Sequence, residues 1–445
     1  MKDCKSCGMN YDTDDYGFCP YCGEVPEDGA ETSGAAAKQD KPEPEVQPKD
    51  KKLRPATGKL KYAIVGLVAL VVIAAAVSGI FALNGSAVTV PDKYETIQEA
   101  INAAEDGDEI VVGVGVYREN IDFNGKNIIL RSTDPDDPEV VDQTIIDGGG
   151  SGTVVSFRSG EGEGAVLSGF TVTRGNGILI SGGSSPVIEN CVIEDNTAEF
   201  GAGMAIFDSS PTIRNNTIIG NSGFLGGGMF IEESSPRIEG NRIVRNRAEM
   251  GSGMVIISGS EPLVIDNHIA ENTAVRLGGG IVIAVDSRPT IQGNTVTGNR
   301  AERNGGGILI EESEPLIEGN TISRNYAANG AGLFIVNSLS SALRIAGNSF
   351  IDNIASIAGG GLYMEGSSPI LEDNSFTDNV SEHLGGGAAV YNSTPVFRLN
   401  LFENNEASGD EGGGAIWVSA DSVLEISDPD DNTYLQNTPD DLYQE

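Results

Sequence analysis

Residues 278–310 decide the fold, and they read GGGIVIAVDSRPTIQGNTVTGNRAERNGGGILI. The stretch opens on a glycine triplet and a short apolar run, and it continues through Pro289, Asn294 and Asn299. It closes on a second triplet and a second apolar run. The same order of features recurs about every 26 residues from Ser184 onward. Self-similarity at a fixed period of this length predicts a solenoid, in which each repeat is one lap of a coil.

Three series of residues define the repeat. The prolines are Pro186, Pro211, Pro236, Pro262, Pro289, Pro315, Pro369 and Pro395. The asparagines ten residues later are Asn196, Asn221, Asn246, Asn272, Asn299, Asn325, Asn379 and Asn405, with Asn353 in the unit that has no proline. A second asparagine series stands five residues earlier and comprises Cys191 in its first place, then Asn216, Asn241, Asn267, Asn294, Asn320, Asn348, Asn374 and Asn400. Nine units in register exclude a chance pattern.

The apolar runs are β-branched and of strand length, such as Ile281–Ile283, with turn residues on both sides. A unit of this size is expected to hold three short strands and three turns. Stacked laps pair their strands in parallel, so equivalent residues lie about 4.8 Å apart. An inward-facing asparagine at a bend then bonds its equivalent on the next lap, which predicts two asparagine ladders. A small residue two positions after the second ladder, such as Ala274, indicates an inward corner with little room.

The ends of a solenoid need covering because exposed strand edges promote polymerisation. Helical spacing over residues 97–104 predicts a cap on the first coil. The acidic segment 428–445 is expected to cover the other end. The predicted fold class is therefore all-β, a right-handed parallel β-helix of about 11–12 coils over residues 88–440, with an N-terminal helical cap.

Charge is distributed unevenly along the chain, whose net charge is −37. Residues 1–84 hold ten Lys or Arg and twelve Asp or Glu, so the solenoid region carries almost all of the negative charge. Such a surface repels nucleic acid and anionic lipid, and it favours solubility or divalent cations. No nucleic-acid partner is expected.

Four of the five cysteines lie near the N-terminus, as Cys4, Cys7, Cys19 and Cys22. Each pair is spaced CxxC and followed by glycine, a tight turn that points two sulfurs at one centre. Two such turns supply four thiolates for tetrahedral Zn²⁺ with no open position, so the zinc is expected to be structural. A redox or disulfide function is the alternative. Residues 1–24 resemble the short zinc-ribbon module at the N-terminus of many prokaryotic membrane proteins.

A membrane anchor is predicted between the ribbon and the solenoid. Residues 25–60 are rich in Pro, Glu, Lys and Ala, so they are expected to form a disordered linker. Residues 62–83 run apolar and uncharged for long enough to cross the membrane as one helix. Basic residues crowd only their N-terminal side, which places the N-terminus in the cytoplasm and the C-terminal domain outside. The alternative to this single-pass cell-membrane protein is a cleaved signal peptide.

The region 91–101 resembles the start of pectin-lyase-like right-handed β-helix domains, including those of pectin methylesterases. The later laps resemble the β-helix repeats of copper-maturation and surface proteins. Residues 376–379 and 413–416 resemble the repeats of chlamydial polymorphic membrane proteins, which are adhesins. The resemblance covers residues 88–440 and implies a fold more specifically than a function. Residues 152–155 (GTVV) lack the aspartate that pectin methylesterases carry in their catalytic strand.

A polysaccharide lyase on this fold needs carboxylates to hold Ca²⁺ and a nearby Arg or Lys as the base. Asp352 and Asp378 hold the same place on adjacent laps, and Arg324 holds it one lap earlier. Like charges about 5 Å apart raise a pKa or recruit a cation. The alternative is that charges along this row form inter-lap ion pairs, each contributing about 0.5 kcal/mol. Another acidic pair, Glu311 and Glu312, leaves the first strand of its lap and is expected to be solvated.

Aromatic residues are the other candidates for ligand binding, because aromatic rings pack against the apolar faces of sugars. The middle position of the first strand is aromatic in three laps, as Phe230, Phe334 and Tyr363. In the last lap this position is Ile416, and Trp417 follows it directly. If this position points outward, it forms an apolar stripe for a glycan or a protein partner. If it points inward, these side chains are core.

The first functional hypothesis is a non-enzymatic surface protein that presents a long face to glycan, cell envelope or another protein, in adhesion or as a structural module. Regular laps support it, because active sites usually interrupt a repeat with long loops. The second hypothesis is a Ca²⁺-dependent enzyme similar to polysaccharide lyases, with Asp352, Asp378 and Arg324 as its residues. A third gives the acidic surface a Ca²⁺-dependent adhesive role.

Overall fold

The computed structural model describes residues 2–3, 10–11, 88–340, 342–409, 412–426 and 432–445. In the N-terminal region, β1 (Lys2–Asp3) and β2 (Asn10–Tyr11) pair antiparallel. The four cysteines of the predicted zinc ribbon, the linker 25–60 and the span 62–83 lie outside the described residues. Within the described part of the chain, no helix is both long and apolar enough to cross a membrane.

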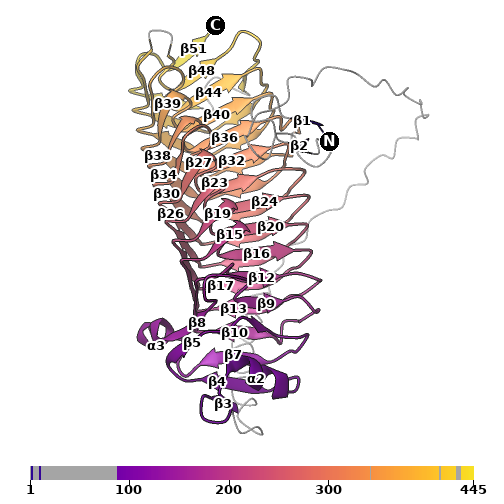
Figure 1. The fold of residues 1–445 in the computed structure, drawn as a ribbon. Helices are drawn as coiled ribbons and strands as arrows, with labels where there is room; N and C mark the ends of the chain where they lie inside the picture. Colours follow the sequence, from indigo (N-terminus) through magenta and orange to yellow (C-terminus); the bar gives the residue numbers. More distant parts are fainter. Residues whose placement is uncertain (1, 4–9, 12–87, 341, 410–411, 427–431) are drawn as a thin grey trace, which may run out of the picture. The chain divides into compact units, whose positions relative to one another are not determined.

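Four parallel β-sheets wind together into one column, shown in Figure 1. Their first and last described strands are β3 (Val88–Val90) and β49 (Glu425–Ile426) in sheet I, β5 (Gly115–Tyr117) and β50 (Thr433–Leu435) in sheet II, β15 (Thr197–Phe200) and β47 (Glu406–Ala407) in sheet III, and β6 (Ile121–Asp122) and β51 (Leu442–Gln444) in sheet IV. The solenoid has about 13 turns, somewhat more than the 11–12 coils predicted.

A single lap shows how the sheets are connected. In chain order its strands are β28 (Ile281–Ile283) in sheet IV, β29 (Thr290–Gln292) in sheet I, β30 (Thr295–Thr297) in sheet II and β31 (Arg300–Ala301) in sheet III. Each strand pairs in parallel with its equivalent on the next lap. Nine laps therefore contain four strands rather than the three predicted. The sheet III segments are short and often polar, so they pair through the backbone without the apolar pattern that marks a strand in sequence.

The strand positions that point into the core differ between the sheets. In the same lap, Ile281, Ile283, Ile291 and Val296 are fully buried members of the main core. Sheets I and II therefore direct the middle residue of each strand into the column, whereas sheet IV directs its first and third residues inward. Because side chains alternate along a strand, the second residue on sheet IV must point outward.

Both predicted asparagine ladders are confirmed. The side-chain amide of Asn294 donates to Oδ1 of Asn320 on the next lap at 3.0 Å and to the carbonyl of Val264 at 2.9 Å. The backbone N–H of Asn294 donates to the same Oδ1 at 2.8 Å. Asn299 repeats this pattern in the second ladder. Each ladder therefore pairs buried polar groups at a bend that would otherwise lack partners.

A third ladder consists of serines and was not predicted. The backbone N–H of one serine donates to Oγ of the serine on the next lap, as from Ser287 to Ser313 at 3.2 Å. These bonds link Ser209 to Ser234, Ser234 to Ser260, and Ser287 through Ser313, Ser338, Ser367 and Ser393 to Ser422. The signal was present in the sequence, because most of these serines stand two residues before a proline of the repeat.

The N-terminal cap is confirmed. Helix α2 (Ile97–Ala103) buries Ile97, Ala100 and Ile101 at the first lap, and Thr96 caps it by accepting from the N–H of Glu99. Figure 1 shows α2 beside the first strands of the column. A second helix, α3 (Pro138–Gln143), lies in the long connection that precedes β8 (Thr144–Asp147).

The C-terminal segment does not cover the end of the column as predicted. In its described part, β50 pairs with β46 (Leu401–Glu403) and β51 pairs with β48 (Ile416–Val418). Residues 433–435 and 442–444 therefore belong to a last lap of the solenoid. The acidic composition of the segment hid this role, because parallel pairing depends on backbone groups more than on side-chain charge.

Candidate functional site

The middle residues of the sheet IV strands form an apolar row on the outer face of the column. In β32 (Ile308–Glu311), Ile308 and Ile310 belong to the main core, whereas Leu309 belongs to a separate cluster. Of the two alternatives left open by the sequence, the structure thus selects the outward one. We call this row the outer stripe; it comprises Ala205, Phe230, Val255, Val282, Leu309, Phe334, Tyr363, Ala389 and Trp417.

In β48 the residue that belongs to the outer stripe is Trp417 and not Ile416. Ala389 pairs with Trp417, while Ile416 and Val418 point into the main core. Ala415 takes the place that the third glycine has in other laps, since the N–H of Ala388 donates to its carbonyl. This one-residue shift moves every side chain of the strand to the opposite face.

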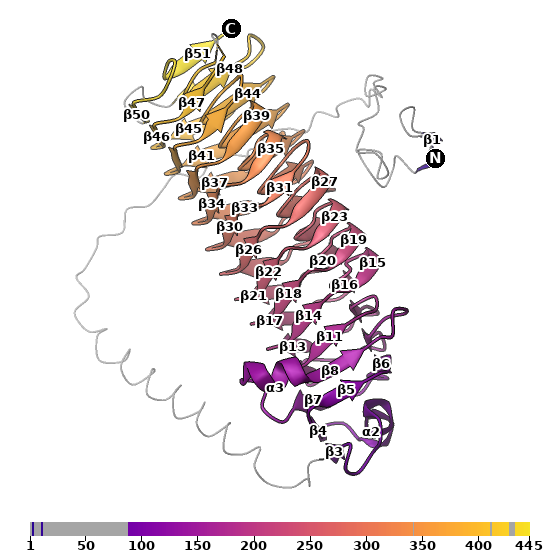
Figure 2. The same cartoon turned by 60° about the vertical axis from the view of Figure 1, so that its left-hand side comes forward.

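The outer stripe is packed against the ends of the sheet III strands. Phe230, Val255 and Leu309 share their cluster with residues of sheet III that include Leu225 and Met250. Figure 2 shows the sheet III strands stacked along the column. Burial is therefore high even though the stripe faces outward, and Phe230 is only 2% exposed.

Aromatic rings gather on the C-terminal laps of the stripe. The rings of Phe334 and Tyr363 are parallel, with centroids 5.2 Å apart. Tyr391 and Trp417 are also parallel, with centroids 6.5 Å apart, and Tyr391 is 46% exposed. The four aromatic residues predicted as ligand contacts thus lie on one face. They form the floor of that face, whereas Tyr391 offers the most open ring.

A second row, directly beside the stripe, contains carboxylates. Glu311 pairs in register with Val336, and Val336 pairs with Glu365. The hydroxyl of Tyr363 donates to Glu365 at 3.4 Å. Burial, then Glu365, raise the pKa of Tyr363, so this phenol stays protonated and its one O–H is directed to Glu365.

The prediction that Glu311 is solvated is wrong. Its side chain is 6% exposed, and burial together with the neighbouring Glu312 raises its pKa to about 7. Glu311 follows three apolar residues in its strand. It points outward, and its equivalent on the next lap is Val336. Sequence reasoning missed it because two successive glutamates resemble a solvated strand end. Aligning the laps by structural register would have shown that Val336 lies beside Glu311 on the next lap.

A polar pocket of about 550 Å³ opens at the end of these sheet IV strands. It is lined by Asp286, Arg288, Glu312, Ser313, Glu314, Asn337, Ser338, Leu339 and Ser340. Asp286, Glu312 and Asn337 all have a left-handed backbone, with φ of 57°, 44° and 53°. Arg288 Nε lies 3.0 Å from a carboxylate oxygen of Glu314. The pocket therefore offers charged and amide groups immediately after the outer stripe.

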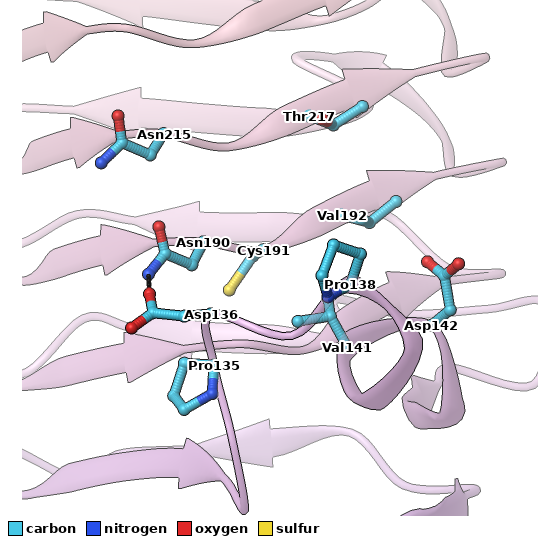
Figure 3. Close-up of a pocket in the computed structure, with 10 residues that line it drawn as sticks. All are labelled: Pro135, Asp136, Pro138, Val141, Asp142, Asn190, Cys191, Val192, Asn215 and Thr217. Carbon is cyan, nitrogen blue, oxygen red and sulfur yellow. Dashed lines mark hydrogen bonds between the residues drawn. The ribbon is translucent and has the colours of Figure 1, made fainter.

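A second pocket, of about 250 Å³, lies beside α3 and is shown in Figure 3. The amide of Asn190 donates to Asp136 at 2.9 Å across it. Cys191 also lines this pocket, but it is 1% exposed and burial raises the pKa of its thiol to about 12. A thiol with that pKa is not a nucleophile near neutral pH.

The residues considered for a lyase lie elsewhere. Arg324, Asp352 and Asp378 are exposed residues of one turn position, with φ of 53°, 54° and 55°. The N–H of Asp352 donates to the carbonyl of Thr377, so the two aspartates do lie on adjacent laps. No ion pair joins Arg324 to either aspartate in the described structure, and no group of three or more His, Cys, Asp or Glu there could hold a metal.

The ion pairs of the described residues occur in other rows, so the ion-pair interpretation of the Arg324 row is wrong. On the outer side of sheet I, Arg214 pairs with Glu189 at 2.6 Å and Arg344 pairs with Glu372 at 2.8 Å. Both are inter-lap pairs with exposed arginines, and such pairs contribute little to stability. The catalytic assignment of Asp352, Asp378 and Arg324 stays a prediction.

Comparison with known proteins supports the architecture. The family described as the right handed beta helix region matches residues 128–296, 226–362 and 264–430. No curated protein and no solved structure matches the chain. The matched residues overlap and cover more than half of the sequence. The chain belongs to the family of the right handed beta helix region.

Proposed function

We propose that this protein is a membrane-tethered surface β-helix that binds a glycan chain along the outer face of sheet IV. One observation carries the proposal: the polar pocket between Asp286 and Ser340 lies at the end of the strands whose outward residues include Leu309 and Phe334. Sites for sugars need apolar contact and a few convergent polar groups together. Equivalent groups repeat on each lap about 4.8 Å apart, which suits a polymer lying along the column.

Charge supports one class of glycan over another. Asp286, Glu312 and Glu314 line the pocket, whereas Arg288 is its cationic residue and is paired with Glu314. The whole chain carries a net charge of −37. A polyuronate would be repelled by this surface, so a neutral or basic polysaccharide is the better ligand. The lyase hypothesis requires an anionic substrate and gains no support from this face.

Removing the aromatic ring of Tyr363 or the positive charge of Arg288 is expected to weaken glycan binding. In the purified full chain, Tyr363→Ala and Arg288→Ala should each reduce the affinity for a glycan selected on an array by about ten-fold, or about 1.4 kcal/mol. Isothermal titration calorimetry measures the loss. The matched control is Gln292→Ala, which removes an exposed amide from sheet I in one of the same laps.

Two outcomes would contradict this assignment. Unchanged affinity in both Tyr363→Ala and Arg288→Ala would mean that the glycan binds elsewhere. Release of unsaturated uronate products from an anionic polysaccharide, abolished by Asp378→Ala, would establish the lyase hypothesis in its place.

The proposed membrane tether is inferred from the amino-acid sequence. A closed four-thiolate site at Cys4, Cys7, Cys19 and Cys22 would hold one structural Zn²⁺ on the cytoplasmic side of the span 62–83. Metal analysis of the purified chain should find about one zinc per molecule. The double variant Cys4→Ser, Cys7→Ser should lose the zinc and keep its glycan affinity, because the ribbon and the solenoid are separate regions of the chain. Zinc retained by this variant would refute the ligand assignment.

A further inference from the structure

Glu311 is a buried carboxyl group without a partner on the outer face. It is only 6% exposed, and it follows Leu309 and Ile310 in β32. The neighbouring lap places Val336 beside it. Within the described structure, its carboxylate takes part in no hydrogen bond and no ion pair. A buried charge in such a place is unfavourable unless something pairs with it.

The other two glutamates of the same row show what Glu311 lacks. Glu232 accepts a hydrogen bond from the hydroxyl of Ser258 at 3.3 Å. Glu365 accepts one from the hydroxyl of Tyr363 at 3.4 Å. Among the described glutamates of this row, Glu311 is therefore the one for which no hydrogen-bond donor is found in the protein.

The groups around Glu311 determine which ligand would fit. Glu312 follows it in the chain, Asp286 lies in the turn one lap before, and Asn337 in the turn one lap after. The cationic residue of the adjoining pocket, Arg288, is paired with Glu314 at 3.0 Å. An ionised carboxylate only accepts hydrogen bonds, so the ligand must donate. The surrounding acidic groups favour a donor that is positively charged.

We propose that Glu311 is a specificity-determining residue that pairs with a protonated amine of an amino-sugar polymer lying on the outer stripe. This inference rests on the glycan-binding function proposed above and names its ligand class. The exposed ring of Tyr391 contacts a sugar ring, the adjoining pocket receives the hydroxyl groups, and Glu311 selects the free amine over its acetylated form. A charge-assisted hydrogen bond in a water-poor site is stronger than a neutral one, which gives the discrimination.

Two ligands that share one backbone and differ in whether their amines are free or acetylated test this proposal. The glucosamine hexamer and the N-acetylglucosamine hexamer are titrated calorimetrically into the full chain at pH 7. The wild type should bind the glucosamine hexamer about ten-fold more tightly. Glu311→Gln keeps the size of the side chain and should remove most of this preference while leaving the affinity for the acetylated hexamer unchanged. Glu318→Gln, in β33 (Leu316–Glu318) of sheet I on the same lap, is the matched control and should keep the preference.

The outcomes separate this inference from the function on which it rests. If Glu311→Gln keeps the preference, or if the wild type binds both hexamers equally, the role of Glu311 is refuted and glycan binding stands. If both hexamers fail to bind while the array yields another glycan, the amino-sugar class is refuted. If no glycan binds at all, the proposed function itself fails. A ten-fold preference that only Glu311→Gln removes supports both.

Discussion

Replacing Asn299 by alanine is expected to destabilise the solenoid by about 4 kcal/mol. Asn299 is fully buried, and its Oδ1 accepts from both the N–H and the side-chain amide of Asn272, at 3.1 and 2.9 Å. Its own amide donates to the carbonyl of Ile269 and to Oδ1 of Asn325, at 2.9 and 3.2 Å. Alanine leaves these groups without partners in the interior, and each unpaired buried group costs about 1–3 kcal/mol.

Urea unfolding followed by circular dichroism measures this loss. The matched control is Gln292→Ala in the same lap, which removes an exposed amide and should change stability by less than about 0.5 kcal/mol. Hydrogen exchange adds a local test, because each lap contacts only its neighbours. Protection should fall most at the laps of Asn272 and Asn325. Equal stability of the two variants would show that the ladder contributes little, and that apolar packing alone holds the column together.

The second large effect is a pH-dependent gain in stability from Glu311→Gln. The folded protein holds the pKa of Glu311 at about 7, raised from 4.5 by burial and by Glu312. Between these values the folded state binds more protons than the unfolded state, so wild-type stability falls as pH rises through this window. The difference of about 2.5 pKa units corresponds to about 3 kcal/mol. The variant should therefore be more stable than the wild type by about 3 kcal/mol at pH 8, and nearly equal to it at pH 4.

Denaturation midpoints measured at several pH values between 4 and 8 test the sign as well as the size. Glu318→Gln, in sheet I of the same lap, supplies the comparison, because it leaves Glu311 and Glu312 unchanged and should not reproduce the pH-dependent gain. A Glu311→Gln advantage that shrank as pH rose would contradict the burial of this carboxyl. A buried acid kept at such a cost is typical of a site selected for binding and not for stability.

The architecture could be predicted from the sequence because the residues that form one lap recur at nearly the same spacing from lap to lap. The prolines and asparagines at constant spacing indicated parallel laps, and the bonds from Asn294 to Asn320 confirm the ladder that this spacing implies. The helical spacing over residues 97–104 likewise predicted the cap formed by α2. These are properties of local periodicity, which depends only on residue type and position.

The candidate site could be predicted only in part. Phe230, Phe334 and Tyr363 were recognised as one row, but their direction was undecided because both faces of a sheet IV strand are apolar. In a continuous apolar run, polar and apolar residues do not alternate, so the sequence does not show which residues point inward. Trp417 was placed beside the row rather than in it, since one glycine position of its lap is taken by Ala415.

By itself, the sequence determined that this chain winds into parallel laps with amide ladders at two bends. Only the tertiary structure decided that the outer stripe faces away from the main core, that a fourth sheet packs against it, and that Glu311 is buried without a partner. The reason is that burial on an outer face depends on side chains from a different sheet. The period of a repeat records which residues are stacked, but not what covers them.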